Sequence, residues 1–227
     1  MKQQFPAFRQ HECIAGYIFL FAQLFLIPIA VVLICEFAGI SQLSTQQFFC
    51  FLSNFIFAAV LFPHYWAQSI KSTTGKVSLI LRTTAIYLAV YYFSSILINF
   101  LIFTLDPEFM NANDSAISSM TSESFPLMAI GIVLLVPPVE ELLFRGVVFG
   151  QLYNTHPILA YIVSALVFSA IHVVGYIGSV PIFRLLLSLL QYIPISLCLA
   201  RAYEKTGSIF APVLIHSIIN FIGVLSM

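Results

Sequence analysis

The chain has 227 residues, with nine basic and nine acidic side chains, so its formal net charge is zero. Hydrophobic residues make up 60% of it and charged residues only 8%, and the mean hydropathy is +1.01. Soluble domains carry about a quarter charged residues, so this composition excludes a soluble protein. The balanced charge also gives no basic face for nucleic acid. We therefore expect an integral membrane protein in contact with the lipid bilayer, whose oligomeric state the sequence leaves open.

Seven apolar segments are long enough to cross about 30 Å of hydrocarbon as helices. They lie at 14–37, 48–66, 78–103, 125–150, 157–174, 181–200 and 208–225. The first is longer than the apolar part of a signal peptide and is expected to be retained. Prolines remove a helical hydrogen bond, so kinks are expected at Pro28, Pro137, Pro138 and Pro194. The sequence predicts an all-α polytopic transmembrane bundle of about seven spans, with six to eight as the range.

A polar stretch at 104–124 separates the first three segments from the last four. Its acidic residues are Asp106, Glu108, Asp114 and Glu123. We expect three regions: a three-span membrane region at 1–103, a polar loop outside the cytoplasm at 104–124, and a four-span membrane core at 125–227.

The basic residues predict the orientation, because short cytoplasmic loops carry the excess of lysine and arginine. With the N-terminus in the cytoplasm, only Arg184 falls in an outer loop. The residues on the cytoplasmic side are then Lys2, Arg9, Lys71, Lys76, Arg82, Arg201 and Lys205. We therefore expect a cytoplasmic N-terminus.

The fourth segment carries three charges, on Glu140, Glu141 and Arg145. Each costs roughly 2.5 to 3.5 kcal/mol near the centre of a membrane helix, so all three need a partner or a chemical use. Glu141 and Arg145 are four residues apart and can form an ion pair, whose role is either structural or part of a site. Glu140 points about 100° away without a local partner, which suits a carboxylate that takes a proton from water.

Three further polar residues lie inside apolar segments: His172 in the fifth, and His216 and Asn220 in the seventh. At 1.5 Å per residue they reach the same layer as Glu140, so the three segments are expected to meet in one polar chamber that opens toward the cytoplasmic half. His216 and Asn220 are four residues apart and can donate hydrogen bonds to a single point, as an oxyanion hole requires. An interhelical clasp is the alternative for each of them.

These residues form three motifs: EELLFR at 140–145, FSAIH at 168–172 and HSIIN at 216–220. They follow the patterns EExxxR, FxxxH and HxxxN. In this order on three membrane segments, the chain resembles the CAAX-protease and bacteriocin-processing (CPBP, or Abi) family of intramembrane endopeptidases. The resemblance covers about 125–222 and leaves the first three segments unmatched.

The resemblance implies roles for the motif residues. Glu140 and His172 would activate the attacking water, while His216 and Asn220 would stabilise the tetrahedral oxyanion. In this interpretation region 125–227 is the catalytic membrane core.

The other matched residues would support the site. Glu141 and Arg145 would brace it, and Phe168 would pack beside it. Apart from the resemblance, Gly131 and Gly146 on the fourth segment are expected to allow close approach of neighbouring helices.

A metal is the open question of the expected chemistry. Glu140, His172 and His216 would be the ligands if zinc took part. The chain has no HExxH sequence, and its four cysteines are scattered without metal-ligand spacing. We therefore favour a reaction without metal or other cofactor, with zinc as the alternative.

The expected function is hydrolysis of a peptide bond in a peptide or membrane-protein substrate, in peptide maturation or bacteriocin self-immunity. The resemblance to small Abi proteins implies a multi-pass protein of the bacterial plasma membrane. The main alternative is a non-catalytic membrane protein that binds a bacteriocin and confers immunity. A proton-coupled transporter is less favoured, because the first three segments carry no counterpart of the polar residues.

Overall fold

The computed structural model describes residues 5–227, and in this range it is helical with no β-strand. The predicted all-α class is confirmed. Five consecutive pieces form one continuous helix, Phe125–Tyr153: α7 (Phe125–Ile130), η1 (Gly131–Leu135), α8 (Val136–Glu141), η2 (Leu142–Phe149) and α9 (Gly150–Tyr153). The other helices are α1 (Gln10–Ala22), α2 (Leu26–Phe37), α3 (Leu43–Leu61), α4 (Pro63–Thr73), α5 (Val77–Leu105), α6 (Ala112–Glu123), α10 (Pro157–Ile171), η3 (Val174–Tyr176), α11 (Ile182–Thr206) and α12 (Phe210–Leu225).

All seven predicted apolar segments are helical, but they differ in length. Within residues 5–227, four helices are long and apolar enough to cross a membrane: α3, α5, Phe125–Tyr153 and α11. A fifth span is formed if α1 and α2, which are bent by 55°, count as one broken helix. The remaining two, α10 and α12, have 15 and 16 residues, short of the roughly 20 that a full span needs. By length, the count is therefore four to five spans.

The prolines alter the helices in different ways. The break between α1 and α2 lies just before Pro28. Pro137 and Pro138 do not interrupt their helix, which instead widens into π-helical turns at η1. A proline ring crowds the carbonyl four residues earlier and donates no hydrogen bond, and a wider turn relieves both problems. Pro194 lies inside α11, which continues past it.

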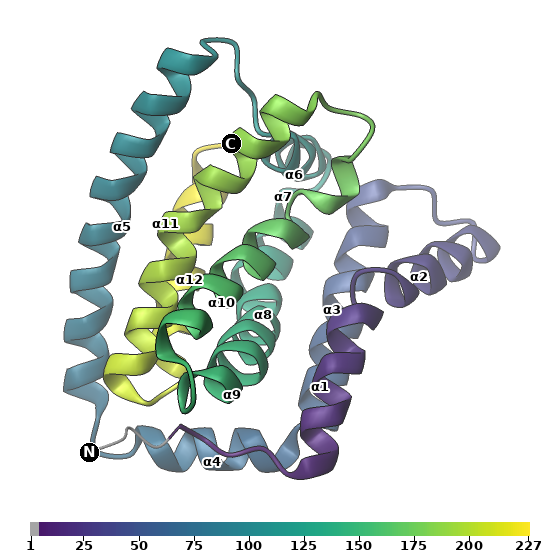
Figure 1. The fold of residues 1–227 in the computed structure, drawn as a ribbon. Helices are drawn as coiled ribbons and strands as arrows, with labels where there is room; N and C mark the ends of the chain where they lie inside the picture. The colour runs from purple at the N-terminus through teal and green to yellow at the C-terminus, as the bar shows by residue number, and fades with distance from the viewer. Residues whose placement is uncertain (1–4) are drawn as a thin grey trace.

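Four helices form the centre of the bundle, Phe125–Tyr153, α10, α11 and α12, and the other helices pack around them (Figure 1). The long α5 lies on one side against α11 and α12, while α3 lies on the other side against η1 and α8. Helix α4 runs across one end of the bundle (Figure 1). The first three apolar segments therefore flank the helices that carry the motifs.

Close packing at two glycines explains how the central helix meets its neighbours. A side-chain carbon at Gly131 would lie 2.5 Å from the ring of Phe51, and one at Gly146 would lie 2.8 Å from the hydroxyl of Tyr65. Cβ atoms in proteins essentially never lie this close to another heavy atom, so a side chain at either glycine would displace its aromatic neighbour. The predicted close approach at these glycines is confirmed.

A buried glutamate fixes the end of the bundle at α4. The carboxylate of Glu12 is fully buried and accepts hydrogen bonds from the backbone N–H groups of Arg9, His64 and Tyr65, at 2.9, 2.9 and 3.3 Å. A carboxylate at a helix N-terminus satisfies donors that have no partner within the helix. At the same end Lys76 Nζ donates to the Thr206 carbonyl at 2.9 Å.

The expected orientation places this end in the cytoplasm, because Lys71, Lys76 and Lys205 lie there, on or beside α4 and the end of α11. Lys2, also assigned to this side, lies outside the described residues. The orientation stays a prediction.

The polar stretch at 104–124 is ordered, in contrast to the loop that its composition predicts. It contains α6, whose N-cap Asn111 accepts hydrogen bonds from the backbone N–H groups of Asn113 and Asp114. Asp106 pairs with Arg184 at 2.7 Å, and Glu123 accepts from the backbone N–H of Ser44 at 2.7 Å. These contacts fix α6 beside α7 and the neighbouring part of α11 (Figure 1).

Candidate active site

The central helix supplies the three predicted charges. Glu141 and Arg145 form the predicted ion pair, at 3.1 Å, and both side chains are fully buried. Arg145 Nη2 also donates to the carbonyl and the hydroxyl of Ser196 on α11, at 3.1 and 3.2 Å. Its guanidinium carbon lies 4.6 Å from the ring centre of Phe168 on α10, a cation–π distance. Arg145 thus connects three helices, and Phe168 contributes more than packing.

Glu141 also orients a histidine. Its Oε1 lies 2.9 Å from His216 Nδ1, and His216 is almost fully buried. A carboxylate accepts hydrogen bonds, so Nδ1 carries the proton and Nε2 is directed elsewhere. His216 Nε2 lies 3.9 Å from Oε2 of Glu140.

His172 is held in a similar way. It lies at the end of α10, and its Nδ1 is 2.8 Å from the carbonyl oxygen of Phe168. A carbonyl can only accept, so Nδ1 is again the protonated nitrogen. His172 Nε2 then faces Glu140 Oε2 at 4.0 Å.

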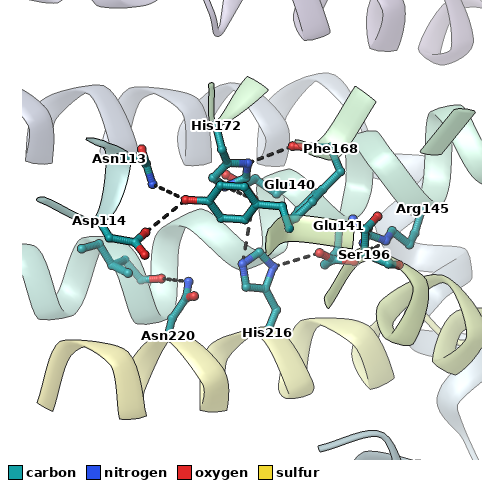
Figure 2. Close-up of polar contacts among 12 residues, drawn as sticks. Asn113, Asp114, Glu140, Glu141, Arg145, Phe168, His172, Ser196, His216 and Asn220 are labelled. Carbon is teal, nitrogen blue, oxygen red and sulfur yellow. Dashed lines mark hydrogen bonds and ion pairs between the residues drawn. The ribbon is translucent and has the colours of Figure 1, made fainter. Parts of the chain in front are cut away.

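Glu140 therefore lies between two imidazoles that come from different helices (Figure 2). The predicted convergence of three segments on one polar chamber is confirmed. The Glu140 Oε2 atom is buried and has no hydrogen-bond partner among residues 5–227. Separations of 3.9 and 4.0 Å are too long for direct hydrogen bonds but match groups that one water molecule can bridge.

The predicted meeting point of two donors from His216 and Asn220 is not formed in this structure. His216 Nδ1 is bonded to Glu141, and Asn220 Nδ2 donates to the carbonyl of Ile132 at 2.9 Å. The π-helical turn at η1 brings that carbonyl within reach of α12. Each carboxamide nitrogen has two hydrogens, so Asn220 retains one for another acceptor. The role of the pair in stabilising an oxyanion stays a prediction.

A cavity of about 480 Å³ contains this site. Glu140, His172, His216 and Asn220 all line it. It extends toward α6 and toward residues 223–227 at the C-terminus, away from α4 (Figure 1). The prediction that the chamber opens toward the predicted cytoplasmic end is therefore wrong.

Aromatic packing explains why the chamber does not open toward α4. The rings of Phe5, Phe149, Tyr153 and Tyr203 pack on one another at that end, with Phe5 stacked on Tyr203 at 4.5 Å. They fill the space between the helices. The number of residues along a segment predicts the depth of a side chain but not which end of the bundle is closed by packing.

Three further residues join the site without having been predicted. The ring of Tyr192 stacks on His172 with centroids 4.5 Å apart. Its hydroxyl donates to Asp114 Oδ1 at 3.1 Å and accepts from Asn113 Nδ2 at 3.1 Å. Asn113 and Asp114 come from α6 and lie on the far side of the site from Arg145 (Figure 2). Burial raises the pKa of the Asp114 carboxyl above its ordinary value.

The geometry does not fit a zinc site. Ligand atoms of a tetrahedral zinc with bonds of about 2.0 to 2.2 Å lie about 3.3 to 3.6 Å apart. Glu140 Oε2 is 4.0 Å from His172 Nε2 and 3.9 Å from His216 Nε2. Within residues 5–227 no three histidine, cysteine or acidic side chains are grouped closely enough to hold a metal ion. A reaction without metal stays the prediction.

Residues 122–222 match the family described as type II CAAX prenyl endopeptidase Rce1-like. The chain is also 28% identical, over 117 residues, to UPF0177 protein YxdF of Lactococcus lactis subsp. lactis (strain IL1403). That match covers 47% of this chain and 59% of the relative, so the chain spans less than two thirds of it. No solved structure matches.

The family match begins at residue 122 and includes all three motifs. It therefore confirms the resemblance inferred from their order and spacing, and it leaves the first three apolar segments outside. The several apolar helices agree with the membrane setting of such proteins. The protein is a multi-pass membrane protein, and its residues 122–222 are similar to the type II CAAX prenyl endopeptidase Rce1-like family.

Proposed function

We propose that this protein is an intramembrane endopeptidase that hydrolyses a peptide bond with a water molecule activated by Glu140 and His172. The observation that carries the proposal is the position of the Glu140 carboxylate. It faces the Nε2 atoms of His172 and His216 at 4.0 and 3.9 Å inside a cavity, with a buried oxygen that has no partner among the described residues.

The hydrogen bonds of the two histidines explain why water suits this place. Both carry a proton on Nδ1, so the neutral ring of His172 presents an unprotonated Nε2. The Glu140 carboxylate and this nitrogen are two acceptors that face one point. A water molecule can donate to Glu140 and to His172 and keep a lone pair directed at a substrate carbonyl.

The proposed reaction begins when Glu140 takes a proton from this water. The water oxygen attacks the carbonyl carbon, and the carbonyl oxygen becomes an oxyanion. Glu140 then gives the proton to the leaving nitrogen as the C–N bond breaks. The immediate products are a carboxylic acid and an amine, which exchange a proton to become a carboxylate and an ammonium ion, and the carboxylate of Glu140 is regenerated.

The oxyanion would be stabilised by His216 and Asn220. In this mechanism His216 carries a proton on both nitrogens and donates to the oxyanion through Nε2, while Glu141 accepts from Nδ1. The second hydrogen of the Asn220 amide is free to donate as well. In the water-poor interior such donors are stronger than in water. Arg145 acts through Glu141, which it holds in place.

The substrate we propose is a peptide or a segment of a membrane protein. The cavity of about 480 Å³ is within the usual range for ligand sites, roughly 300 to 1,000 Å³. Its lining contains both apolar side chains, such as Ile195 and Ile219, and polar side chains, such as Asn113 and Gln191. That mixture suits a peptide with apolar side chains. Peptide maturation or bacteriocin self-immunity in a bacterial plasma membrane is the setting we propose.

The test is cleavage of an internally quenched peptide library by purified protein in detergent. Glu140→Gln is expected to lower kcat/KM at least 100-fold, because it removes the general base. The matched control is Glu36→Gln, on the exposed end of α2, which should cleave like the wild type. A strong chelator should have no effect. Loss with chelator and recovery with zinc would replace the metal-free mechanism, and absence of cleavage by folded wild type would favour a bacteriocin-binding immunity protein.

A further inference from the structure

A second cavity, of about 200 Å³, adjoins the active site on the side of the first three helices. It is lined by the break between α1 and α2, by one face of α3, and by α8. Glu140, His172 and Gln47 line both cavities. The two spaces therefore meet at the proposed catalytic carboxylate.

This cavity contains polar groups that the fold itself does not use. Nε2 of Gln23, at the end of α1, is buried without a hydrogen-bond partner among residues 5–227, and so is Oδ1 of Asn54 on α3. Both residues line the cavity. A buried polar atom without a partner destabilises a fold, so groups of this kind in a cavity indicate a binding role.

The chemistry of these atoms indicates the ligand. Gln23 offers a donor and Asn54 offers an acceptor, which together match the carbonyl and the N–H of a peptide bond. A lipid chain has neither group. The break between α1 and α2, where the helices are bent by 55°, contributes Gln23 and Leu24 to the lining of this cavity. An extended chain that passes from one cavity into the other therefore brings one of its peptide bonds to Glu140.

We propose that Gln23 and Asn54 form a subsite that binds the main chain of the substrate peptide next to the bond that is cleaved, with Gln47 at the junction of the two cavities. This inference rests on the proposed function. It assigns substrate binding to the region before the family match, which begins at residue 122.

The experiment compares Gln23→Leu and Asn54→Leu with Gln42→Leu, an exposed glutamine at the N-terminus of α3. The probe is the best-cleaved member of the quenched peptide library. Each subsite variant should raise KM about three- to tenfold, as expected for one lost hydrogen bond, with kcat changed less than twofold. The control should keep the wild-type KM. The Tm of both subsite variants should stay level or rise, because leucine removes an unpaired buried polar group.

A second measurement uses a probe in which one peptide bond near the cleaved bond is an ester, which has no N–H. Moving the ester along the probe should reveal one position that raises KM for the wild type and for Gln23→Leu but not for Asn54→Leu. The absence of any such position would overturn the pairing of Asn54 with a main-chain N–H.

The outcomes separate this inference from the proposed function. If Glu140→Gln abolishes cleavage while both subsite variants match Gln42→Leu in KM, the subsite is refuted and the protease remains. A lower Tm together with a lower kcat would also refute it, because that result indicates a structural role. If the folded wild type cleaves no peptide, both proposals are overturned.

Discussion

Replacing Arg145 with methionine tests whether the buried ion pair is held together by mutual charge compensation. Methionine keeps most of the side-chain length but removes the charge. It leaves the Glu141 carboxylate, 3.1 Å away and fully buried, without its cation. Removal of one partner from a buried pair costs about 3 to 5 kcal/mol, which is a large part of a typical stability of about 5 to 15 kcal/mol.

The assay is thermal unfolding in detergent, detected by a dye that reacts with thiols as they become exposed. Cys35, Cys50 and Cys198 are buried and serve as reporters. At about 2 to 4 °C per kcal/mol for a chain of this size, Arg145→Met should lower Tm by roughly 6 to 20 °C. The matched control is Arg201→Met, since Arg201 is half exposed and its pair with Glu204 lies at the surface. Its Tm should change by less than about 4 °C.

The double variant Glu141→Gln with Arg145→Met decides the cause. Glutamine keeps an acceptor for His216 Nδ1 while it removes the negative charge. If charge compensation is the reason for the loss, the double variant should be more stable than Arg145→Met alone. A double variant as unstable as the sum of the two single losses would refute the reasoning.

Three further predictions concern stability. Glu12→Ala should lower Tm by about 4 to 12 °C, because three backbone N–H groups lose a charged acceptor worth about 2 to 3 kcal/mol. Gln10 is exposed, so Gln10→Ala should leave Tm unchanged. Equal Tm values for the two variants would contradict the capping role of Glu12. Since burial raises the pKa of Asp114, the packing of α6 on the bundle should be most stable below the ordinary carboxyl pKa, about 3.9, and should weaken as pH rises through the raised pKa. Hydrogen exchange of the α6 backbone amides should become faster over that pH range. The same pH dependence in Asp114→Asn would contradict the role of Asp114. Gly146→Ala should lower Tm, because the new Cβ would lie 2.8 Å from the hydroxyl of Tyr65. Gly175→Ala should leave Tm unchanged, because a Cβ at Gly175 would have no atom within 4 Å. Equal changes in Tm would contradict the role of close packing at Gly146.

The geometry around Glu140 was predictable because charge is rare and costly in an apolar segment. The spacing of Glu141 and Arg145 predicts their ion pair, and depths that fall within one layer of the membrane predict that Glu140, His172 and His216 meet. These inferences need only helical geometry and the cost of burying polar groups. The roles of the four residues in catalysis remain predictions.

The contribution of α6 was not predictable by the same means. The stretch at 104–124 is polar, and polarity without periodicity indicates a loop. Its order depends on contacts with distant residues, such as the hydrogen bond from Asn111 to Gln191 at 2.7 Å. Tyr192 was missed for a related reason, since one tyrosine among ten in an apolar chain carries no local signal until Asp114 is beside it.

The shortness of α10, which makes it a weak span by length, gives the FxxxH spacing a physical meaning. A helix that ends inside the bundle leaves carbonyl groups of its last turn without backbone donors. At the end of α10 the N–H of His172 donates to Ser169, so the carbonyl of Phe168 lacks its usual helical partner. The imidazole of His172 supplies that donor through Nδ1, at 2.8 Å. The hydrogen bond that completes the helix end therefore also directs Nε2 toward Glu140, and a histidine four residues after the phenylalanine meets both needs.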